Sequence, residues 1–326
     1  MSVLITGVTG FIGSRLAHRL VEQGHDVYGL VRHVSRSTLR TLEPVQDRIR
    51  FIEGDLANYH SMRSSIESSL PDTIFHLGAI TPVRYSFENP FPYASVNFEG
   101  TMNLVHAIVE SSPRTRLITA STAEVYGWQP HVPTPENAVL KPSSPYAVSK
   151  AAADSYVQMA SKVFGIKAVV LRCNNTYGRL IEKGFFVEYV VNSMLANQTV
   201  YVGTPDHIRD YMFVSDHVAA YICALENDNE GVFNVSPGNP ISNMEVALKI
   251  SKLTGFTGEI ISGAYPPGYP TRPIACDTDY VVLDSSKIRS ELKWKPTVSL
   301  DEGLTDVAKK RDEVSLRNER QNLYAS

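Results

Sequence analysis

The first half of the chain alternates between short apolar runs and amphipathic segments. Apolar, β-branched runs typical of buried parallel strands occur at residues 2–6, 25–31, 48–55, 72–78, 116–122 and 167–173. Between them, apolar residues recur at helical spacing, which predicts helices at 14–23, 59–70, 94–112 and 146–164. This alternation is typical of an α/β fold with a doubly wound parallel sheet, whose ligands bind beyond the carboxyl ends of the strands.

The second half has a different organisation. After Cys173 the alternation loosens, and Pro and Gly cluster at 237–240 and 263–273. Loops of this kind are typical of a smaller lobe that closes over a ligand. We therefore expect a dinucleotide-binding Rossmann domain at 1–173. Residues 174–326 should form mainly a smaller α/β substrate-binding lobe, with some segments returning to the first domain.

A glycine-rich loop, GVTGFIG, follows the first strand and opens the first helix. Gly7 would permit the tight turn, Gly10 would let the backbone approach a pyrophosphate, and Gly13 would let the helix pack close to the strand. The free N–H groups at the start of the helix would face the anion. In this context the loop predicts a dinucleotide site, although glycine triplets alone also occur in ordinary turns.

The end of the second predicted strand bears on the choice of dinucleotide. NAD-binding folds of this type usually carry a carboxylate about 20 residues after the glycine loop, where it bonds the ribose 2′-hydroxyl. Here the strand ends in Leu30-Val31-Arg32-His33, without a carboxylate, and Arg36 follows. Because Arg32 could bind a 2′-phosphate, we expect NADP. NAD remains possible if these arginines only belong to a solvated loop.

Two motifs near the middle of the chain carry candidate catalytic groups. STAEVYG supplies the hydroxyl of Thr122 and the carboxylate of Glu124, which would share one face of a strand. YAVSK places Tyr146 and Lys150 four residues apart on one helix face. Lowering the pKa of a tyrosine from ~10 to ~7 requires roughly 4 kcal/mol. One positive charge ~4 Å away at an effective dielectric of ~20 supplies about that much. We therefore expect Tyr146 to act as a base beside Lys150.

The amino-acid composition limits which binding partners and which cellular compartment we expect for this protein. The net charge of −3 comes without a basic block, which argues against nucleic acid as a partner. Three widely spaced cysteines fit neither a disulfide framework nor a zinc site, and we expect no metal. No apolar run approaches the ~18 residues of a membrane helix, and the N-terminus lacks a signal-peptide pattern. We expect a cytoplasmic protein that does not bind membranes.

Taken together, these motifs resemble the extended short-chain dehydrogenase/reductase family, in its nucleotide-sugar epimerase/dehydratase branch. The similarity covers nearly the whole chain and includes Asn97 and the segments 54–56, 76–79, 172–178, 209–218, 272–273 and 283–296. It implies a set of cofactor contacts at Gly7, Gly10, Phe11, Ile12, Gly13, Arg32, Asp55, Leu56, Leu77, Ala79, Tyr146 and Lys150.

The resemblance also implies a nucleotide-diphosphate sugar as substrate. Asn175 would contact it, and the guanidinium groups of Arg209 and Arg272 would bind its phosphates. Family members dimerise through two helices of each subunit, so we expect a homodimer formed by the helices 94–112 and 146–164. We expect the outward faces of these helices to carry Leu104, Val105, Ile108, Val157 and Ala160, although these residues would equally suit the core.

The reaction implied by the resemblance begins with transient oxidation of the sugar at C4. Tyr146 would take the proton of the 4-hydroxyl, Thr122 would orient that oxygen, and Lys150 would hold the nicotinamide ribose. Glu124 favours a 4,6-dehydratase, because it could take the C5 proton and lie close to C6. NADP and the Arg272-Pro273 pair favour the GDP-mannose type.

Several alternatives to the dehydratase remain open. They are a UDP-glucose-type 4-epimerase, a 4-keto sugar reductase and a UDP-glucuronate decarboxylase. Ala123 is a departure from the dehydratases, which carry Asp or commonly Ser before this glutamate. Alanine cannot protonate a leaving hydroxyl, so Glu124 would serve as base and then as acid, or water would assist.

Overall fold

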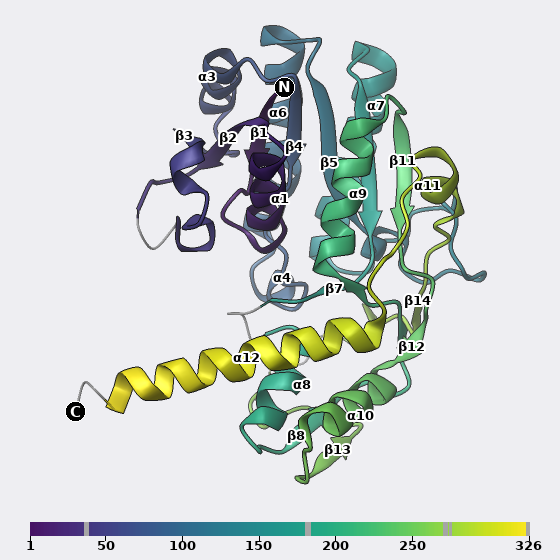
Figure 1. Cartoon of the computed structure of the whole chain (residues 1–326). Helices are drawn as coiled ribbons and strands as arrows, with labels where there is room; N and C mark the ends of the chain where they lie inside the picture. Colours follow the sequence, from purple (N-terminus) through teal and green to yellow (C-terminus); the bar gives the residue numbers. More distant parts are fainter. Residues whose placement is uncertain (36–38, 180–183, 270–272, 274–275, 324–326) are drawn as a thin grey trace.

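A parallel sheet forms the centre of the computed structural model, which describes residues 1–35, 39–179, 184–269, 273 and 276–323, with side chains up to Arg311. Within these ranges the sheet has seven strands in the order β11-β6-β5-β4-β1-β2-β3, and all its pairings are parallel (Figure 1). The strands are β1 (Ser2–Thr6), β2 (Asp26–Val31), β3 (Ile49–Glu53), β4 (Thr73–His76), β5 (Arg116–Thr122), β6 (Ala168–Cys173) and β11 (Gly231–Val235). The predicted doubly wound α/β fold is confirmed, and β11 adds a strand from the second half of the chain.

Helices cover both faces of the sheet (Figure 1). One face is covered by α1 (Phe11–Glu22) and α9 (Val214–Glu226), with α11 (Ser286–Glu291) nearby. The other is covered by α3 (Tyr59–Ser69), α6 (Gly100–Ser111) and α7 (Pro145–Phe164). The result is a three-layer arrangement in which the sheet is apolar on both faces, as its nearly continuous hydrophobic strands predict.

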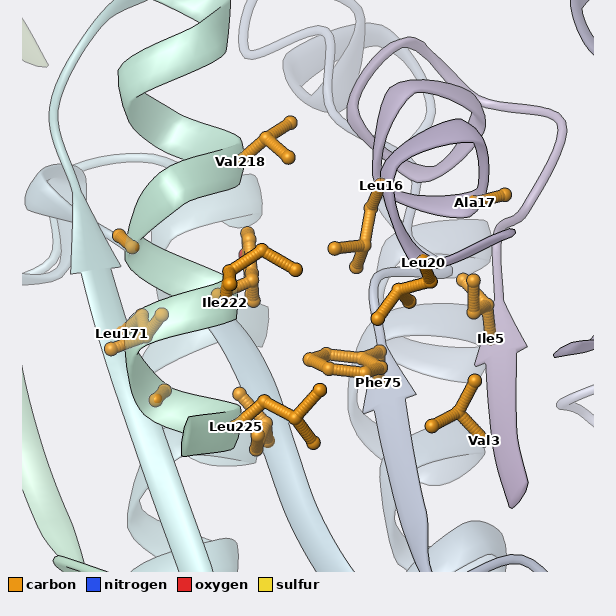
Figure 2. Packing of buried hydrophobic residues seen from close by; sticks show 14 of the residues in the cluster. Val3, Ile5, Leu16, Ala17, Leu20, Phe75, Leu171, Val218, Ile222 and Leu225 are labelled. Carbon is orange, nitrogen blue, oxygen red and sulfur yellow. The ribbon is translucent and has the colours of Figure 1, made fainter. Parts of the chain in front are cut away.

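The packing between α1, α9 and the sheet forms one of the hydrophobic cores. Figure 2 shows Leu16 and Leu20 of α1 facing Ile222 and Leu225 of α9, with Phe75 of β4 beneath them. These side chains are almost completely buried, and each contributes about 1.5–3 kcal/mol relative to full exposure. Because α9 comes from the second half of the chain, this core ties residues after Cys173 to the dinucleotide-binding sheet.

The predicted helix 94–112 is divided in the structure. It comprises the π-helical segment η3 (Ala94–Glu99) and α6, and the short α5 (Phe91–Tyr93) precedes it. Such π-helical segments are often found at functional sites. The five residues that we expected on its outward face and on that of α7 are instead buried in the core against the sheet: Leu104, Val105, Ile108, Val157 and Ala160. That expectation was wrong, because apolar spacing alone does not say which side of a helix faces the sheet.

The remaining elements form a smaller lobe at the carboxyl side of the sheet (Figure 1). Its core is built by α8 (Phe186–Leu195), α10 (Asn243–Thr254) and the long α12 (Leu300–Leu323). Short strands pair around it: β7 (Thr176–Tyr177) with β10 (Met212–Phe213), β8 (Val200–Val202) with β13 (Ile260–Ser262), and β9 (Ile208–Arg209) with β12 (Ile241–Ser242) and β14 (Tyr280–Val281). Single turns complete the described chain: η1 (Arg40–Leu42), η2 (Gln46–Arg48), α4 (Tyr85–Glu88) and η4 (Ala123–Tyr126). Among the helices that the structure describes, none has the length and apolar character needed to cross a membrane.

Candidate functional site

The glycine loop between β1 and α1 is shaped by close backbone approaches. Gly7 has φ +71, and a Cβ atom there would lie 2.8 Å from the amide nitrogen of Gly78. A Cβ atom on Gly13 would lie 2.1 Å from the carbonyl oxygen of Gly7, which is far inside van der Waals contact. At Gly10, by contrast, it would meet only that same oxygen, at 3.1 Å. The backbone is thus packed tightly on one side of the loop and open at Gly10.

The loop leads directly into the N-terminus of α1. Gly10 is the N-cap residue and supplies no side chain, so the amide groups of the first turn are left without intrahelical partners. Phe11 and Ile12, which begin this turn, are half-buried. Free amides at a positive helix end, beside an open glycine, fit the pyrophosphate of a dinucleotide.

Other predicted cofactor residues surround this loop. The main chain after β4 is fixed because the amides of Leu77 and Gly78 donate to Thr6 Oγ1, at 3.2 and 3.0 Å. Leu56 is buried, and its side chain fills the space next to Gly78. Asp55 is exposed and accepts a hydrogen bond from the Ala57 amide at 3.0 Å. Ala79 is half-buried in the segment that leaves β4.

The residues that bear on NAD or NADP lie at the end of β2. Arg32 is exposed immediately after Val31. Close by, Glu53 at the end of β3 accepts a hydrogen bond from the Val34 amide at 3.0 Å and lies 3.5 Å from the His33 ring. Arg36 lies outside the described residues. The loop therefore presents a cation in Arg32 together with an acidic neighbour in Glu53.

Tyr146 and Thr122 come together at the carboxyl ends of β5 and β6. Thr122 is the last residue of β5, and Tyr146 lies in the first turn of α7, whose N-cap is Ser144. The two side chains are hydrogen-bonded, and both are buried. The ring of Tyr93 packs edge-on against that of Tyr146, with centroids 6.3 Å apart. These two candidates, which belong to separate sequence motifs, are thus in contact beyond the strand ends, where this fold binds ligands.

The net effect of the protein environment is to raise the pKa of Tyr146. Burial raises the pKa of the phenol well above its ordinary value. The hydrogen bond with Thr122 lowers it, whereas the Glu124 charge raises it further. The Lys150 Nζ donates to the Ala120 carbonyl oxygen at 2.7 Å. A lowered pKa of Tyr146, through the Lys150 charge together with a bound oxidised nicotinamide, stays a prediction.

Lys150 occupies the next turn of α7 and is buried. Burial lowers the pKa of its ammonium from 10.5 to about 8, while Asp154 and Cys173 oppose the shift. The nearby His76 is buried, and its ring nitrogens lie 2.8 Å from Thr6 Oγ1 and 3.0 Å from Thr101 Oγ1. Burial and the Lys150 charge lower the pKa of His76 to about 3, so this histidine is neutral at physiological pH.

Glu124 lies close to Tyr146, but not for the reason that the sequence suggested. Strand β5 ends at Thr122, and Glu124 stands on the 3₁₀ turn η4. Thr122 caps this turn by accepting a hydrogen bond from the Glu124 amide at 3.2 Å. The carboxylate is half-buried, and no described residue donates a hydrogen bond to it. Glu124 is therefore positioned by the turn η4 and not by strand alternation, and there its charge acts on the phenol of Tyr146.

Asn97 is a residue whose structural role the sequence indicated only through the family resemblance. Its side chain donates to the Ile80 carbonyl oxygen and accepts from the Ile80 amide, at 3.0 and 2.8 Å. It also donates to Ser149 Oγ at 3.0 Å, next to Lys150. The π-helical segment η3 thus links the chain after β4 to α7, which carries Tyr146 and Lys150.

The three predicted substrate residues differ in their settings. Asn175 is exposed at the end of β6, and its carbonyl oxygen accepts from the Met212 amide at 2.9 Å. Arg209 is buried on β9, donates to the Ile208 carbonyl oxygen at 2.9 Å and lies 3.6 Å from the Asp277 carboxylate. Arg272 lies outside the described residues.

No cluster of three or more His, Cys, Asp or Glu side chains suited to a metal occurs among the residues that the structure covers. A cavity of about 560 Å³ lies between α1, α9 and α12, and none of the four catalytic candidates lines it. The four candidates lie instead around the ends of β5 and β6 and in the first two turns of α7.

Comparison with known proteins gives the family. The family model described as GDP-mannose 4,6 dehydratase matches residues 4–307. The chain is 32% identical to UDP-glucose 4-epimerase of Mycolicibacterium smegmatis over 311 residues, which cover 93% of this chain and 96% of that protein. It is 28% identical to dTDP-glucose 4,6-dehydratase of Salmonella typhimurium over 335 residues, 93% of this chain and 91% of that protein.

Solved structures give the same result. The crystal structure of UDP-glucose 4-epimerase from Thermotoga maritima with UDP-glucose superposes with a TM-score of 0.86 at 27% identity, covering 97% of this chain and 100% of that one. The complex of Thermus thermophilus UDP-glucose 4-epimerase with NAD gives 0.82 at 28% identity, with coverage of 95% and 99%. The glycine cradle, the cluster of Thr122, Tyr146 and Lys150, and these matches lead to one conclusion: the chain belongs to the nucleotide-sugar dehydratase and epimerase family of extended short-chain dehydrogenases/reductases.

Proposed function

We propose that this protein is a nucleotide-sugar 4,6-dehydratase that uses a tightly bound nicotinamide dinucleotide. The observation that carries this proposal is the position of Glu124, whose carboxylate lies near the phenol of Tyr146 on a turn capped by Thr122. A 4-epimerase needs no such group, whereas a dehydratase needs a base for the C5 proton and an acid for the C6 hydroxyl.

The residues divide the work as follows. Thr122 hydrogen-bonds the sugar 4-hydroxyl and Tyr146 takes its proton, while Lys150 holds the ribose and adds a positive charge. When bound, the nicotinamide ring would serve as the acceptor of hydride from C4 and later as its donor to C6. Glu124 then removes the C5 proton, which the neighbouring 4-ketone has made acidic. The same proton passes to the departing C6 hydroxyl, which leaves as water. Return of the hydride to C6 leaves an enolate, and C5 takes back a proton from Tyr146 or from solvent to give the 4-keto sugar.

Ala123 makes Glu124 responsible for both proton transfers. The methyl group of Ala123 is buried and has no proton to donate. The Glu124 carboxylate is only half-buried and receives no hydrogen bond from the described residues. A carboxylate without such bonds is free to take a proton and release it within one catalytic cycle. The net reaction is loss of one water and formation of a 4-keto-6-deoxy sugar.

Substitution of Glu124 tests this proposal. Glu124→Gln keeps the size of the side chain and removes the base, so we expect dinucleotide binding to persist and C5 exchange with solvent deuterium to disappear. Loss of a general base typically costs a factor of ~10²–10⁴ in rate. Glu259→Gln, at an exposed position in the smaller lobe, is the matched control and should behave like the parent. Parental turnover by Glu124→Gln would overturn the dehydratase assignment.

A 4-epimerase is the second candidate, favoured by Ala123 and by the similarity to UDP-glucose 4-epimerases. Product mass separates the two, because epimerisation leaves it unchanged and dehydration lowers it by one water. Steady consumption of added NADPH would instead indicate a 4-keto sugar reductase, and release of carbon dioxide from UDP-glucuronate would indicate a decarboxylase. GDP-mannose, dTDP-glucose and UDP-glucose are the first substrates to compare.

For the cofactor we propose NADP, with NAD as the alternative. Arg32 is exposed at the end of β2, where a cation can bind a 2′-phosphate. Arg32→Ala should weaken NADP binding by about tenfold or more and leave NAD binding unchanged, since one charged hydrogen bond contributes ~1.5–3 kcal/mol. Arg114→Ala, another exposed arginine, serves as the control. Equal affinities of the Arg32 variant and the parent for NADP would contradict this assignment.

For the substrate we propose a nucleotide diphosphate held by Arg209, Arg272 and Asn175. Arg209 is already oriented by the Ile208 carbonyl oxygen and by Asp277, which leaves less conformational entropy to lose on binding. Calorimetric titration of UDP, GDP and dTDP into Arg209→Met should show weaker binding of whichever nucleotide the parent prefers. An unchanged affinity would remove Arg209 from the phosphate site.

A further inference from the structure

A buried ion pair lies directly behind the catalytic residues. Asp154 is 2% exposed and stands on α7, one helical turn after Lys150. Its two carboxylate oxygens accept bidentate hydrogen bonds from Arg172 on β6, at 2.9 Å from Nε and 3.0 Å from the second terminal nitrogen. Ser121 Oγ donates to the same carboxylate at 2.6 Å. Asp154 is therefore fixed in place by β5 and β6 together.

Arg172 extends this contact to the turn that carries Glu124. Its other terminal nitrogen donates to Tyr126 Oη at 2.8 Å and to the Glu136 carbonyl oxygen at 3.0 Å. Tyr126 in turn donates to Asn234 Oδ1 at 2.7 Å, on β11. Burial alone would lower the pKa of Arg172, and Asp154 more than offsets that effect, so the guanidinium stays charged.

Three members of this network are close in sequence to catalytic candidates. Ser121 precedes Thr122 on β5, and Tyr126 follows Glu124 by two residues on η4. Asp154 lies one turn from Lys150 and two turns from Tyr146 on α7. The ion pair thus joins the three elements whose relative placement defines the site.

Asp154 also stands one turn of α7 away from Lys150, and its charge raises the pKa of the ammonium. The titratable groups around the ammonium are Asp154 and Tyr146 from α7, Cys173 from β6 and His76 from β4. Burial lowers the pKa of His76 to about 3 and raises that of the Cys173 thiol, so both are neutral near pH 7. Burial likewise raises the pKa of the Tyr146 phenol and keeps it neutral. Of these groups, Asp154 alone carries a negative charge.

We propose that Asp154 is a positioning residue: held by Arg172 and Ser121, its carboxylate keeps the buried Lys150 ammonium charged and fixes α7 against the strand of Thr122 and the turn of Glu124. The relevance to catalysis rests on the proposed role of Lys150. A charged Lys150 is what can hold the nicotinamide ribose by hydrogen bonds and favour an ionised Tyr146. Without Asp154 the ammonium would face only neutral groups and a carbonyl oxygen.

The direction of the expected effect follows from burial. The pKa of Lys150 stands at about 8 although Asp154 raises it, because burial outweighs the carboxylate. Asp154→Asn keeps the shape and removes the charge, so the pKa of Lys150 should fall below that of the parent. At neutral pH a large share of the protein would then carry an uncharged Lys150. Asp154→Glu restores the charge and should restore a midpoint near that of the parent.

The experiment is an NMR titration of the Lys150 side chain in protein labelled with ¹³C,¹⁵N-lysine, with the signal assigned by its loss in Lys150→Met. In the parent, Lys150 should titrate with a midpoint near pH 8. In Asp154→Asn the proton concentration at the midpoint should be at least tenfold higher. Asp306→Asn is the matched control, since Asp306 pairs with Lys310 on the surface at 2.9 Å and should leave Lys150 unchanged. A folded Asp154→Asn protein with the parental midpoint would overturn the proposal.

Removing one partner of a buried pair leaves an uncompensated charge and can prevent folding. The double variant Asp154→Asn/Arg172→Met avoids this by making both positions neutral, and its Lys150 midpoint should again lie below that of the parent. An unchanged or higher midpoint in the double variant would equally refute the proposal. The titration needs neither substrate nor turnover, so a wrong reaction class would leave its outcome untouched.

Discussion

Adding a single methyl group at Gly13 should damage the dinucleotide site more than any other small change in the loop. The Cβ of an alanine there would lie 2.1 Å from the Gly7 carbonyl oxygen and 3.1 Å from the Val8 Cα. Both contacts are to backbone, which cannot rotate away as a flexible side chain would. The first turn of α1 must therefore move away from the end of β1.

The size of the movement sets the size of the effect. Carbon–oxygen contacts are normally about 3.3 Å or longer, so the helix and the loop must separate by roughly 1 Å. Overpacking of this kind usually costs ~1–3 kcal/mol in free energy of unfolding. The same shift moves the amides of Phe11 and Ile12 away from the pyrophosphate. We expect a further loss of tenfold or more in dinucleotide affinity, because hydrogen bonds to a charged group contribute ~1.5–3 kcal/mol each.

Urea denaturation and calorimetric titration with NADP and NAD measure the two effects separately. Gly184→Ala is the matched control: an added Cβ there has no atom within 4 Å, and the backbone does not have positive φ. The control should keep parental stability and affinity. If Gly13→Ala bound dinucleotide as tightly as the parent, the close packing of α1 on Gly7 would not be what shapes the cradle.

Three further predictions concern Tyr146, two buried histidines and the surface of α7. Tyr146→Phe should lower turnover by a factor of ~10²–10⁴ while dinucleotide binding persists. The control Tyr93→Phe loses only a hydrogen bond to the Pro82 carbonyl oxygen and should remain active. Equal rates for the two variants would remove Tyr146 from the chemistry. Burial lowers the pKa of His76 and of His217 to about 3, so the stability gained from keeping both neutral is lost as the pH falls from ~6.5 toward 3. The free energy of unfolding should fall by about 2 kcal/mol between pH 6.5 and 5.5. His217→Phe should halve that fall in urea titrations. We propose a homodimer that forms through the surface of α7 around the exposed Val163. Light scattering should give twice the 36.1 kDa mass of one chain, and Val163→Asp should give the mass of the monomer. A monomeric parent would contradict the proposal.

The sequence predicted the sheet well, and the structure brings the candidates Thr122 and Tyr146 together, because both features depend on local signals. Buried parallel strands read as continuous apolar runs, and their order along the chain is enough to place their carboxyl ends on one edge. Thr122 and Tyr146 are 24 positions apart, yet the strand end and the helix start both had recognisable patterns. The glycine loop was recognisable for the same reason.

Features that depend on tertiary contacts were missed. The pair of Asp154 and Arg172 joins a helix to a strand 18 residues away, and neither position looks unusual in a linear reading. The one available signal was a carboxylate on α7 a single turn after Lys150, on the face that meets the sheet. Similarly, strand periodicity placed Glu124 on β5, whereas Thr122 ends the strand by capping a 3₁₀ turn with its own hydroxyl.

The pKa of Tyr146 shows how burial can reverse an argument made from charge alone. A lysine at the right spacing suggested an acidified phenol, but desolvation raises the pKa more than nearby groups lower it. Lys150 is itself buried, with a pKa of about 8, and is bonded to a carbonyl oxygen. In the proposed mechanism a charged Lys150 and the bound nicotinamide would favour the ionised phenol, and Asp154 would keep Lys150 charged.

The fate of the hydrogen on C4 tests the central claim most directly. Nucleotide sugars carrying deuterium at C4, with GDP-mannose, dTDP-glucose and UDP-glucose as the panel, would be incubated with the enzyme and the products analysed by mass spectrometry and NMR. We predict a product lighter by one water with the deuterium moved to C6, and none with Tyr146→Phe. A product of unchanged mass that keeps deuterium at C4, or equal conversion by Tyr146→Phe, would contradict the account.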